Sequence, residues 1–138
     1  MSRIVKIASG FLLTMVLAFL VSSFVVTEKR TEREKWLSQE WKMWKVEEDG
    51  QEVEPTYSRF ILTLKKNFTF VITKEYEMTH RGTWDYTNGK LTLSDKVTNK
   101  DIVLPVEQLD ESHLVFSGYE SDKRSTYLTP VSNKDAIH

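Results

Sequence analysis

The 138-residue sequence contains no cysteine. This absence excludes disulfide bonds, a thiol nucleophile, a metal site built on thiolates and lipid attachment to a cysteine. It fits an exported protein that avoids stray oxidation, and it equally fits the many cytosolic proteins without cysteine. Cysteine usage alone therefore does not identify the compartment.

An excess of positive charge is also missing. The formal net charge is −1, from 19 basic and 20 acidic residues. Arg3 and Lys6 are the only charged residues before Glu28, so 17 basic and all 20 acidic residues lie beyond residue 27. A nucleic-acid-binding domain normally carries a clustered excess of Lys and Arg. The sequence therefore predicts no nucleic-acid partner.

Motifs typical of catalytic or metal sites are absent from the sequence as well. No two histidines are spaced at i, i+4, no glutamate lies in a zincin motif, and there is no nucleophile elbow or triad signature. Carboxylate pairs such as Glu47-Glu48 and Asp110-Glu111 adjoin turns, where solvated charges are the usual state. We therefore predict a protein that is not an enzyme, with no catalytic residues, no cofactor and no metal.

Charge is scarce at the N-terminus. From Ile7 to Thr27 the chain has 21 residues without a charged side chain. A helix rises about 1.5 Å per residue, so this stretch is just long enough for the roughly 30 Å hydrocarbon core of a bilayer. We predict a transmembrane anchor or signal peptide over residues 1–27; a buried helix of a soluble domain is the alternative. Residues 28–36 are predicted to be a charged linker or short helix, and residues 132–138 a C-terminal tail.

The length of the apolar segment bears on its cleavage. Val21-Ser22-Ser23 is a passable cleavage site, but apolar residues continue to Val26, beyond the roughly 7–15 of a signal peptide. We therefore favour an inner-membrane anchor with the domain exported, because only six residues precede the apolar run. Cleavage would instead give a periplasmic or secreted protein. Both interpretations predict a protein of the cell envelope or beyond.

From Glu40 onward the hydrophobic pattern has a period of two, which is typical of strands with one buried face. In the stretch RGTWDYTNGKLTLSD (81–95), Trp84 and Tyr86 alternate before Asn88-Gly89, which supplies the two residues of a tight hairpin turn. The same criterion predicts eight strands, at about 40–47, 57–65, 67–76, 78–87, 90–95, 100–109, 113–120 and 124–131.

Short connections join these strands, so sequential neighbours should pair antiparallel. An up-and-down barrel and a two-sheet sandwich both hide sheet edges. A Greek-key sandwich needs long crossovers, whereas the one long connection, 48–56, joins the first two strands. The sequence therefore predicts an all-β fold: an eight-stranded antiparallel up-and-down barrel over residues 37–131, preceded by an N-terminal transmembrane or signal helix.

Three stretches resemble the bacterial lipocalin-like domain family: LSQEWKMWKVEEDG (37–50), RFILTLKKNFTFVIT (59–73) and RGTWDYTNGKLTLSD. Leu37 and Trp41 match the Leu-x-Gly-x-Trp start common in the family, from which Gln39 departs. Gly82-Thr83-Trp84 and the following Leu91-Thr92-Leu93 match its Gly-Thr-Trp hairpin. The resemblance implies a barrel that binds a small, often apolar molecule.

The resemblance also implies a closed end of the barrel. In lipocalins, a tryptophan of the first strand packs at the closed end against an arginine near the last strand. Trp41 corresponds to the tryptophan, and Arg124 is the candidate for its partner. A ligand would then enter at the opposite mouth, formed by the 48–56 connection and the turns near 76–77, 95–99 and 120–123.

Alternation predicts which side chains face the interior, and those near the open mouth are the candidate ligand-binding residues. With His80 as a polar handle, they are Phe60, Ile72, Met78, His80, Trp84, Leu93 and Tyr127. His80 is alternatively a hydrogen-bonded residue of the wall. Because so many large side chains point inward, we expect a largely filled barrel with at most a shallow pocket at one mouth.

Two functions are compatible with such a barrel. The first is an exported, membrane-tethered lipocalin-like binding module for a small apolar or amphipathic ligand. The alternative is a filled β-barrel that acts as a protein–protein interaction or structural domain in the cell envelope, with another envelope protein as its partner. An empty apolar volume of a few hundred Å³ favours the first, and a solid interior with an exposed apolar patch favours the second.

Overall fold

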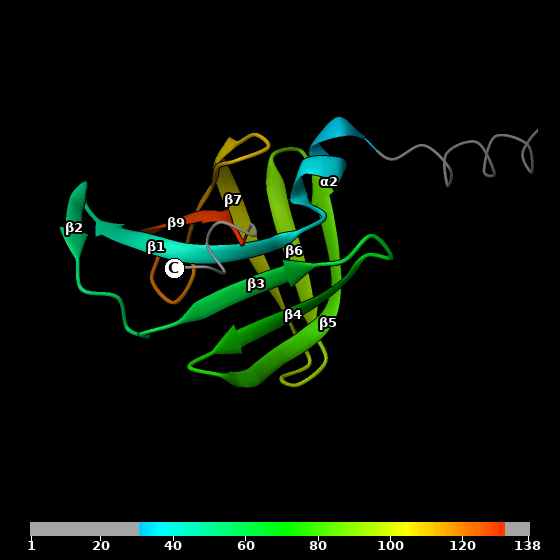
Figure 1. The fold of residues 1–138 in the computed structure, drawn as a ribbon, viewed down its shortest axis with the longest axis horizontal. Coiled ribbons are helices and arrows are strands. Elements are labelled where there is room, and N and C mark those ends of the chain that lie inside the picture. Colours follow the sequence, from blue (N-terminus) through cyan, green and yellow to red (C-terminus); the bar gives the residue numbers. More distant parts are fainter. Residues whose placement is uncertain (1–30, 132–138) are drawn as a thin grey trace, which may run out of the picture. The chain divides into compact units, whose positions relative to one another are not determined.

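The computed structural model describes residues 31–131 (Figure 1). The elements are α2 (Glu32–Leu37), β1 (Glu40–Glu48), β2 (Gln51–Val53), β3 (Phe60–Leu64), β4 (Thr69–Lys74), β5 (Glu77–Thr87), β6 (Lys90–Asp95), β7 (Lys100–Leu109), β8 (Leu114–Ser117) and β9 (Arg124–Pro130). Within this range no helix has the length and apolarity needed to cross a membrane. The predicted anchor or signal segment and C-terminal tail lie outside the described residues.

The strands form one antiparallel sheet that closes on itself. Their order is β2-β1-β3-β4-β5-β6-β7-β8-β9, and β1 also pairs with β9. The closed ring therefore consists of β1 and β3 to β9, with β2 added as a short flap (Figure 1). This confirms the predicted eight-stranded antiparallel barrel. The barrel arises from the short turns, because they make each strand pair with its neighbour in the sequence. The pairing of β1 with β9 then closes the ring.

The predicted turn at Asn88-Gly89 has φ values of 54° and 74°. Two successive residues with positive φ are the conformation that a two-residue hairpin turn with the natural strand twist requires. The turn between β3 and β4 is stabilised differently, because the Asn67 side-chain oxygen accepts hydrogen bonds from the backbone N–H and hydroxyl of Thr69, at 3.2 and 2.6 Å. Local side chains therefore fix both turns.

Gly82 is required by the close approach of two strands. A Cβ atom at this position would lie 1.9 Å from the carbonyl oxygen of Ser94 on β6 and 3.1 Å from the ring of Phe70. Real Cβ atoms essentially never come this close to a backbone oxygen. The glycine of the Gly-Thr-Trp stretch therefore permits β5 to pack against β6 and against the core.

The core fills the barrel from one end to the other. Its fully buried members come from α2 and seven of the strands: Leu37, Trp41, Phe60, Leu62, Leu64, Phe70, Ile72, Leu91, Leu93, Leu104, Leu114, Phe116 and Leu128. Leu62, Ile72, Leu93 and Leu104 have no exposed surface at all. A water-sized cavity beside them would expose part of their surface, so these side chains pack directly against their neighbours.

Two indoles hold together the end of the barrel at which β1 begins. The Trp41 indole N–H donates to the carbonyl of Leu37 at 3.0 Å, which ties α2 to the first strand. The Trp84 indole N–H donates to the carbonyl of Lys65 at 2.9 Å, in the turn between β3 and β4. Each ring fills core volume while its polar edge satisfies a carbonyl. This end of the barrel is closed, and Trp84 belongs to it.

A β-bulge in β5 reverses the predicted orientation of Met78. Ile72 of β4 pairs with His80, but Thr73 pairs with Met78, so Thr79 is the extra residue. Beyond a bulge the alternation of faces shifts by one residue. His80 therefore shares the inner face with Ile72, whereas Met78 points outward and is 59% exposed. The prediction that Met78 faces the interior is wrong.

Tyr127 also lies on the outer face, so its predicted interior position is wrong. In β9 it is Thr126 and Leu128 that are buried, at 2% and 1% exposure. The Tyr127 ring instead packs edge-on against Trp44 of β1, with centroids 5.9 Å apart, and its hydroxyl donates to the carboxylate of Glu47. The outward orientation leaves the hydroxyl with a partner that the apolar interior does not offer.

The wall of the barrel is interrupted between β1 and β3. One edge of β1 pairs with β9 from Trp41 to Glu48. The other edge pairs with β3 only through residues 40–42, and with β2 through residues 46–48. Beyond Lys42 the two strands separate, and the segment 49–59, with β2 and an irregular stretch, covers the gap.

Candidate ligand-binding site

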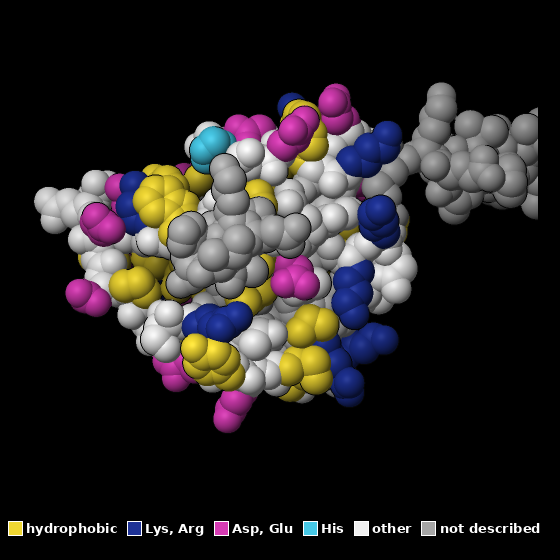
Figure 2. Space-filling model, viewed as in Figure 1, with side chains coloured by type: hydrophobic (Ala, Val, Ile, Leu, Met, Phe, Trp, Pro, Cys, Tyr) yellow, Lys and Arg dark blue, Asp and Glu magenta, His cyan; other side chains and the backbone are white. Residues whose placement is uncertain are grey.

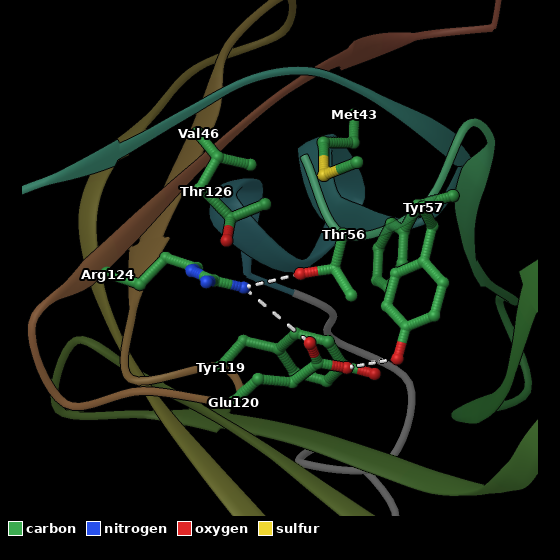
Figure 3. A pocket seen from close by; sticks show the side chains of 9 residues that line it. Met43, Val46, Thr56, Tyr57, Tyr119, Glu120, Arg124 and Thr126 are labelled. Atoms are coloured by element: carbon green, nitrogen blue, oxygen red, sulfur yellow. Dashed lines mark hydrogen bonds and ion pairs between the residues drawn. The ribbon is translucent and has the colours of Figure 1, made fainter. Parts of the chain in front are cut away.

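A small pocket lies at the barrel mouth opposite Trp41, which we call the mouth pocket (Figure 3). The mouth is formed by the segment 49–59 and by the turns that follow β4, β6 and β8. Nine residues line the pocket: Met43, Val46, Thr56, Tyr57, Phe60, Tyr119, Glu120, Arg124 and Thr126. They come from β1, the covering segment, β3, the turn between β8 and β9, and β9 itself.

The floor of the mouth pocket is apolar. Phe60 and Tyr119 pack edge to face with ring centroids 5.4 Å apart, and Tyr119 in turn contacts Phe116, at 6.3 Å. Met43 and Val46 complete the floor from β1. Burial is the largest influence on the Tyr119 hydroxyl, and it raises the pKa of that group.

Arg124 joins the rim of the pocket to the covering segment. Its guanidinium donates to Glu48 Oε1 from Nη2 at 2.8 Å and from Nε at 3.1 Å, and Nη1 donates to the Thr56 hydroxyl at 3.1 Å. Glu48 and Trp41 stand at opposite ends of β1. The prediction that Arg124 meets Trp41 at the closed end is therefore wrong, because β9 runs antiparallel to β1 and begins at the open mouth.

Lys74 is a nearly buried cation beside the pocket, with only 10% of its side chain exposed. Its ammonium lies 3.1 Å from Glu120 Oε1, donates to the Tyr57 hydroxyl at 3.4 Å, and sits over the Tyr57 and Tyr119 rings. Burial by itself would lower the pKa of Lys74, but its bonds to Tyr119, Glu120 and Tyr57 outweigh burial and raise that pKa. Lys74 is therefore held in its charged form.

Glu120 links the two cations. Oε1 accepts a hydrogen bond from Lys74. It also accepts one from the Tyr57 hydroxyl at 2.8 Å, while Oε2 lies 3.6 Å from Arg124 Nη1 (Figure 3). Its backbone has a φ of 67°, which is uncommon for a residue other than glycine. One carboxylate on the turn between β8 and β9 thus holds the segment 49–59 in place through Tyr57.

The mouth pocket is closed in this structure. Its volume is about 10 Å³, and a cavity needs roughly 10–15 Å³ of this kind to hold one water molecule. A larger molecule can enter if the covering segment 49–59, or the turn that carries Tyr119 and Glu120, moves. Residues 54–59 of that segment belong to no strand, so this movement does not require a ladder to separate along those residues.

The predicted ligand-binding residues do not gather in one place. Phe60 lines the mouth pocket, whereas Ile72 and Leu93 are fully buried in the core. Trp84 lies at the closed end, and Met78 and Tyr127 are on the outer wall. Sequence reasoning missed Tyr57, Lys74, Tyr119 and Glu120. One usable signal was the position of Lys74, which continues the inward series of Phe70 and Ile72.

His80 faces the barrel rim, where it is bonded to a buried carboxylate. Its Nδ1 lies 2.5 Å from Asp95 Oδ2, and the Asp95 side chain has no exposed surface. Asp95 also accepts from the backbone N–H of Val97 and the Thr98 hydroxyl, each at 2.9 Å. Burial would raise the pKa of Asp95, but the bonds from Val97, His80 and Thr98 outweigh it and lower that pKa. This arrangement fixes the turn after β6.

Across residues 31–131, no group of three or more His, Cys, Asp or Glu side chains is arranged to hold a metal ion. The fold of the described residues defines the class of the domain, which is a closed eight-stranded antiparallel β-barrel. The solved structure of a lipocalin-like protein from Bacteroides uniformis superimposes on the chain with a TM-score of 0.54. The match covers 69% of this chain and 98% of that protein at 14% sequence identity, so it establishes likeness of fold alone. No protein-family model and no curated protein matches the sequence.

Proposed function

We propose that this domain is a non-catalytic binding module whose ligand, a small apolar or amphipathic molecule, binds in the mouth pocket. The observation that carries the proposal is the separation of β1 from β3 beyond Lys42, directly over an apolar floor. A continuous barrel would pair these strands along their length. Here the irregular stretch 54–59 replaces the ladder. It is held by side-chain bonds to Glu120 and Arg124 and by a backbone hydrogen bond from Glu75 N–H to the Arg59 carbonyl, so a ligand can take its place at a low cost in backbone hydrogen bonds.

Methionine methyl groups offer a direct test of this proposal. Met43 lies in the pocket floor, and Met78 lies on the outer wall as an internal control. The full-length chain, labelled with carbon-13 at its methionine methyls and kept in solution with an uncharged detergent, is titrated with hexan-1-ol, a small neutral amphiphile. We expect a saturable shift of the Met43 signal with little change at Met78. No shift of Met43, or equal shifts of both signals, contradicts the proposal.

Two tyrosines make a matched pair of variants. Tyr57 is part of the covering segment, and its hydroxyl bonds to Glu120. Tyr76 lies on the turn after β4 and is 78% exposed. Tyr57→Phe removes the hydroxyl that holds the pocket closed, so we expect tighter hexan-1-ol binding. Tyr76→Phe keeps its ring over the Arg59 guanidinium and should leave the binding unchanged. Equal effects of the two substitutions would show that Tyr57 does not control access.

We further propose that the domain is exported and stays tethered to the inner membrane by residues 1–27. The support is the run of 21 residues without charge from Ile7 to Thr27. Cell fractionation followed by a high-salt wash should leave the full-length chain with the membranes. A soluble product that begins near Phe24 would show that the segment is a cleaved signal peptide instead.

A second candidate function is a protein–protein interaction in the cell envelope. It is supported by the filled core and by Trp44, which is 54% exposed on the outer face of β1 beside an open groove lined by His113 and Thr129. On the face of the molecule drawn in Figure 2, hydrophobic side chains lie in separate groups among charged ones. A photo-crosslinking residue in place of Trp44 should then capture a protein in the native host, and one in place of the exposed Val103 should not. Equal capture at both positions would indicate unspecific contact.

A further inference from the structure

Two cations converge on one carboxylate at the mouth pocket. Lys74 and Arg124 have side chains that are 10% and 18% exposed, and both face Glu120 from different strands. Tyr57 adds a hydroxyl donor to the same carboxylate, at 2.8 Å. Glu120 itself extends from a turn and not from a strand. Two barrel strands and the covering segment thus supply the donors, and the turn between β8 and β9 supplies the acceptor.

We propose that the ligand of the mouth pocket is an amphiphile with a carboxylate head group, and that Glu120 occupies the head-group position in the closed structure. This inference rests on the proposed function of the pocket and names the chemical class of its ligand. An incoming carboxylate displaces Glu120 and takes its place between Lys74, Arg124 and Tyr57. No covalent step is involved.

The charges at the mouth favour a single negative charge. In the closed structure Lys74 and Arg124 are balanced by Glu48 and Glu120. Glu48 stays bound to Arg124 through two hydrogen bonds when the turn moves, because both residues belong to paired strands. Departure of Glu120 therefore leaves one unbalanced positive charge, which one carboxylate neutralises. A charge-assisted bond to a partly buried cation is among the stronger hydrogen bonds.

The shape of the site fits the other half of such a molecule. Met43, Val46 and Phe60 belong to the apolar floor of the same pocket. A head group in the position of the Glu120 carboxylate can direct an alkyl chain onto this floor, under the segment 49–59. The polar end of the ligand meets the rim and the apolar end meets the floor, as in a pocket that orients an amphiphile through few polar contacts.

The test compares two probes of equal chain length at neutral pH, hexanoate and hexan-1-ol, on the full-length chain. Saturation of the Met43 methyl shift gives a Kd for each probe, and their ratio measures the preference for a carboxylate. Glu120→Gln keeps the side-chain size and removes the competing charge, so we expect the preference for hexanoate to rise about tenfold over wild type. Glu120→Ala provides a second variant with the same expectation. Lys74→Met should reduce the preference to near one, and the matched substitution Lys90→Met, on an exposed lysine of the closed end, should keep the wild-type ratio.

The outcomes separate this inference from the function on which it rests. If both probes shift Met43 with the same Kd in wild type and in Glu120→Gln, the pocket binds amphiphiles but the carboxylate preference is refuted. A preference that survives Lys74→Met also refutes it, because Lys74 is the cation closest to Glu120. If neither probe shifts Met43 in any variant, the proposed function itself fails.

Discussion

Arg124, the first residue of β9, pairs with Glu48, the last residue of β1, and their side chains meet at 2.8 Å. The two residues are 76 positions apart in the sequence. Their ion pair closes the barrel at the open mouth, and the same guanidinium reaches Thr56 of the covering segment. One side chain therefore contributes both to the closure of the wall and to the closure of the pocket.

The first prediction concerns this pair. A double-mutant cycle of Arg124→Ala and Glu48→Ala, measured by urea unfolding, should give a coupling free energy of about 0.5–1 kcal/mol, because both side chains are partly exposed. The coupling should fall at high salt. Arg81→Ala, on an exposed arginine of β5, serves as the control and should cost less than about 0.5 kcal/mol. A coupling of zero would mean that Arg124 acts through its contacts with Thr56 and Glu120 instead.

Gly82→Ala should be among the most destabilising single-methyl additions in the domain. The new Cβ would meet the Ser94 carbonyl at 1.9 Å, so β5 and β6 must separate. We expect a loss of about 3 kcal/mol or more in the free energy of unfolding, at the upper end for overpacked sites. Gly50→Ala is the control, since nothing lies within 4 Å and only its φ of 80° opposes a side chain. Equal costs at the two positions would contradict the close approach of the strands.

The bulge at Thr79 predicts opposite outcomes for one substitution at two nearby positions. Met78→Asp adds a charge to a side chain that is 59% exposed, so stability should change by no more than about 0.5 kcal/mol. Ile72→Asp buries a charge in the core and should prevent folding. Circular dichroism and thermal unfolding distinguish the two. A Met78→Asp variant that fails to fold would restore the inward orientation predicted from simple alternation.

Asp95 predicts a pH dependence of stability. Its folded pKa is lower than that of an aspartate in the unfolded chain, near 3.9. A depressed pKa contributes stability above the unfolded pKa, and that contribution is lost as the pH falls through the folded value. Asp95→Asn should therefore cost about 1–2 kcal/mol at neutral pH, from weaker bonds to His80, Val97 and Thr98. The difference between variant and wild type should shrink below about pH 4, and a constant difference across this range would contradict the assignment.

The barrel could be predicted because its signals are local. Asn88-Gly89 identifies a hairpin by itself, and the eight predicted strands overlap the eight that close the ring. The orientation errors have a different origin. The bulge that turns Met78 outward depends on the pairing of β5 with β4. No residue type next to Thr79 indicates a bulge in the sequence. In β9 alternation alone predicts that Tyr127 is buried. Leu128 is buried instead, because the tyrosine hydroxyl requires a polar partner, which it finds in Glu47 on the outer face.

The candidate site was less predictable than the fold because its members are distant in the sequence. Tyr57 and Glu120 are 63 positions apart, and Lys74 and Glu120 are 46 apart. Charged residues at turns are usually solvated, so the sequence around Glu120 does not indicate that its side chain takes part in a binding site. Arg124 was singled out by its position near the last strand, but antiparallel pairing with β1 carries it to the mouth opposite Trp41. The direction of a strand, and not only its existence, decides which end of a barrel its residues reach.

The pairing of β1 with β9 also bears on the order of folding. Strands β3 to β9 form a meander in which each hairpin closes only a short loop, whereas β1 and β9 meet across most of the domain. Closing long loops is entropically unfavourable and slows folding, so we expect the meander to form first and β1 to dock last. The backbone N–H of Val131 donates to the carbonyl of Glu40 at 2.9 Å, so the two ends of the barrel segment come together in that final step. Pulsed hydrogen exchange would then show late protection at Trp41 to Glu48, and early protection there would place the seam in the folding nucleus.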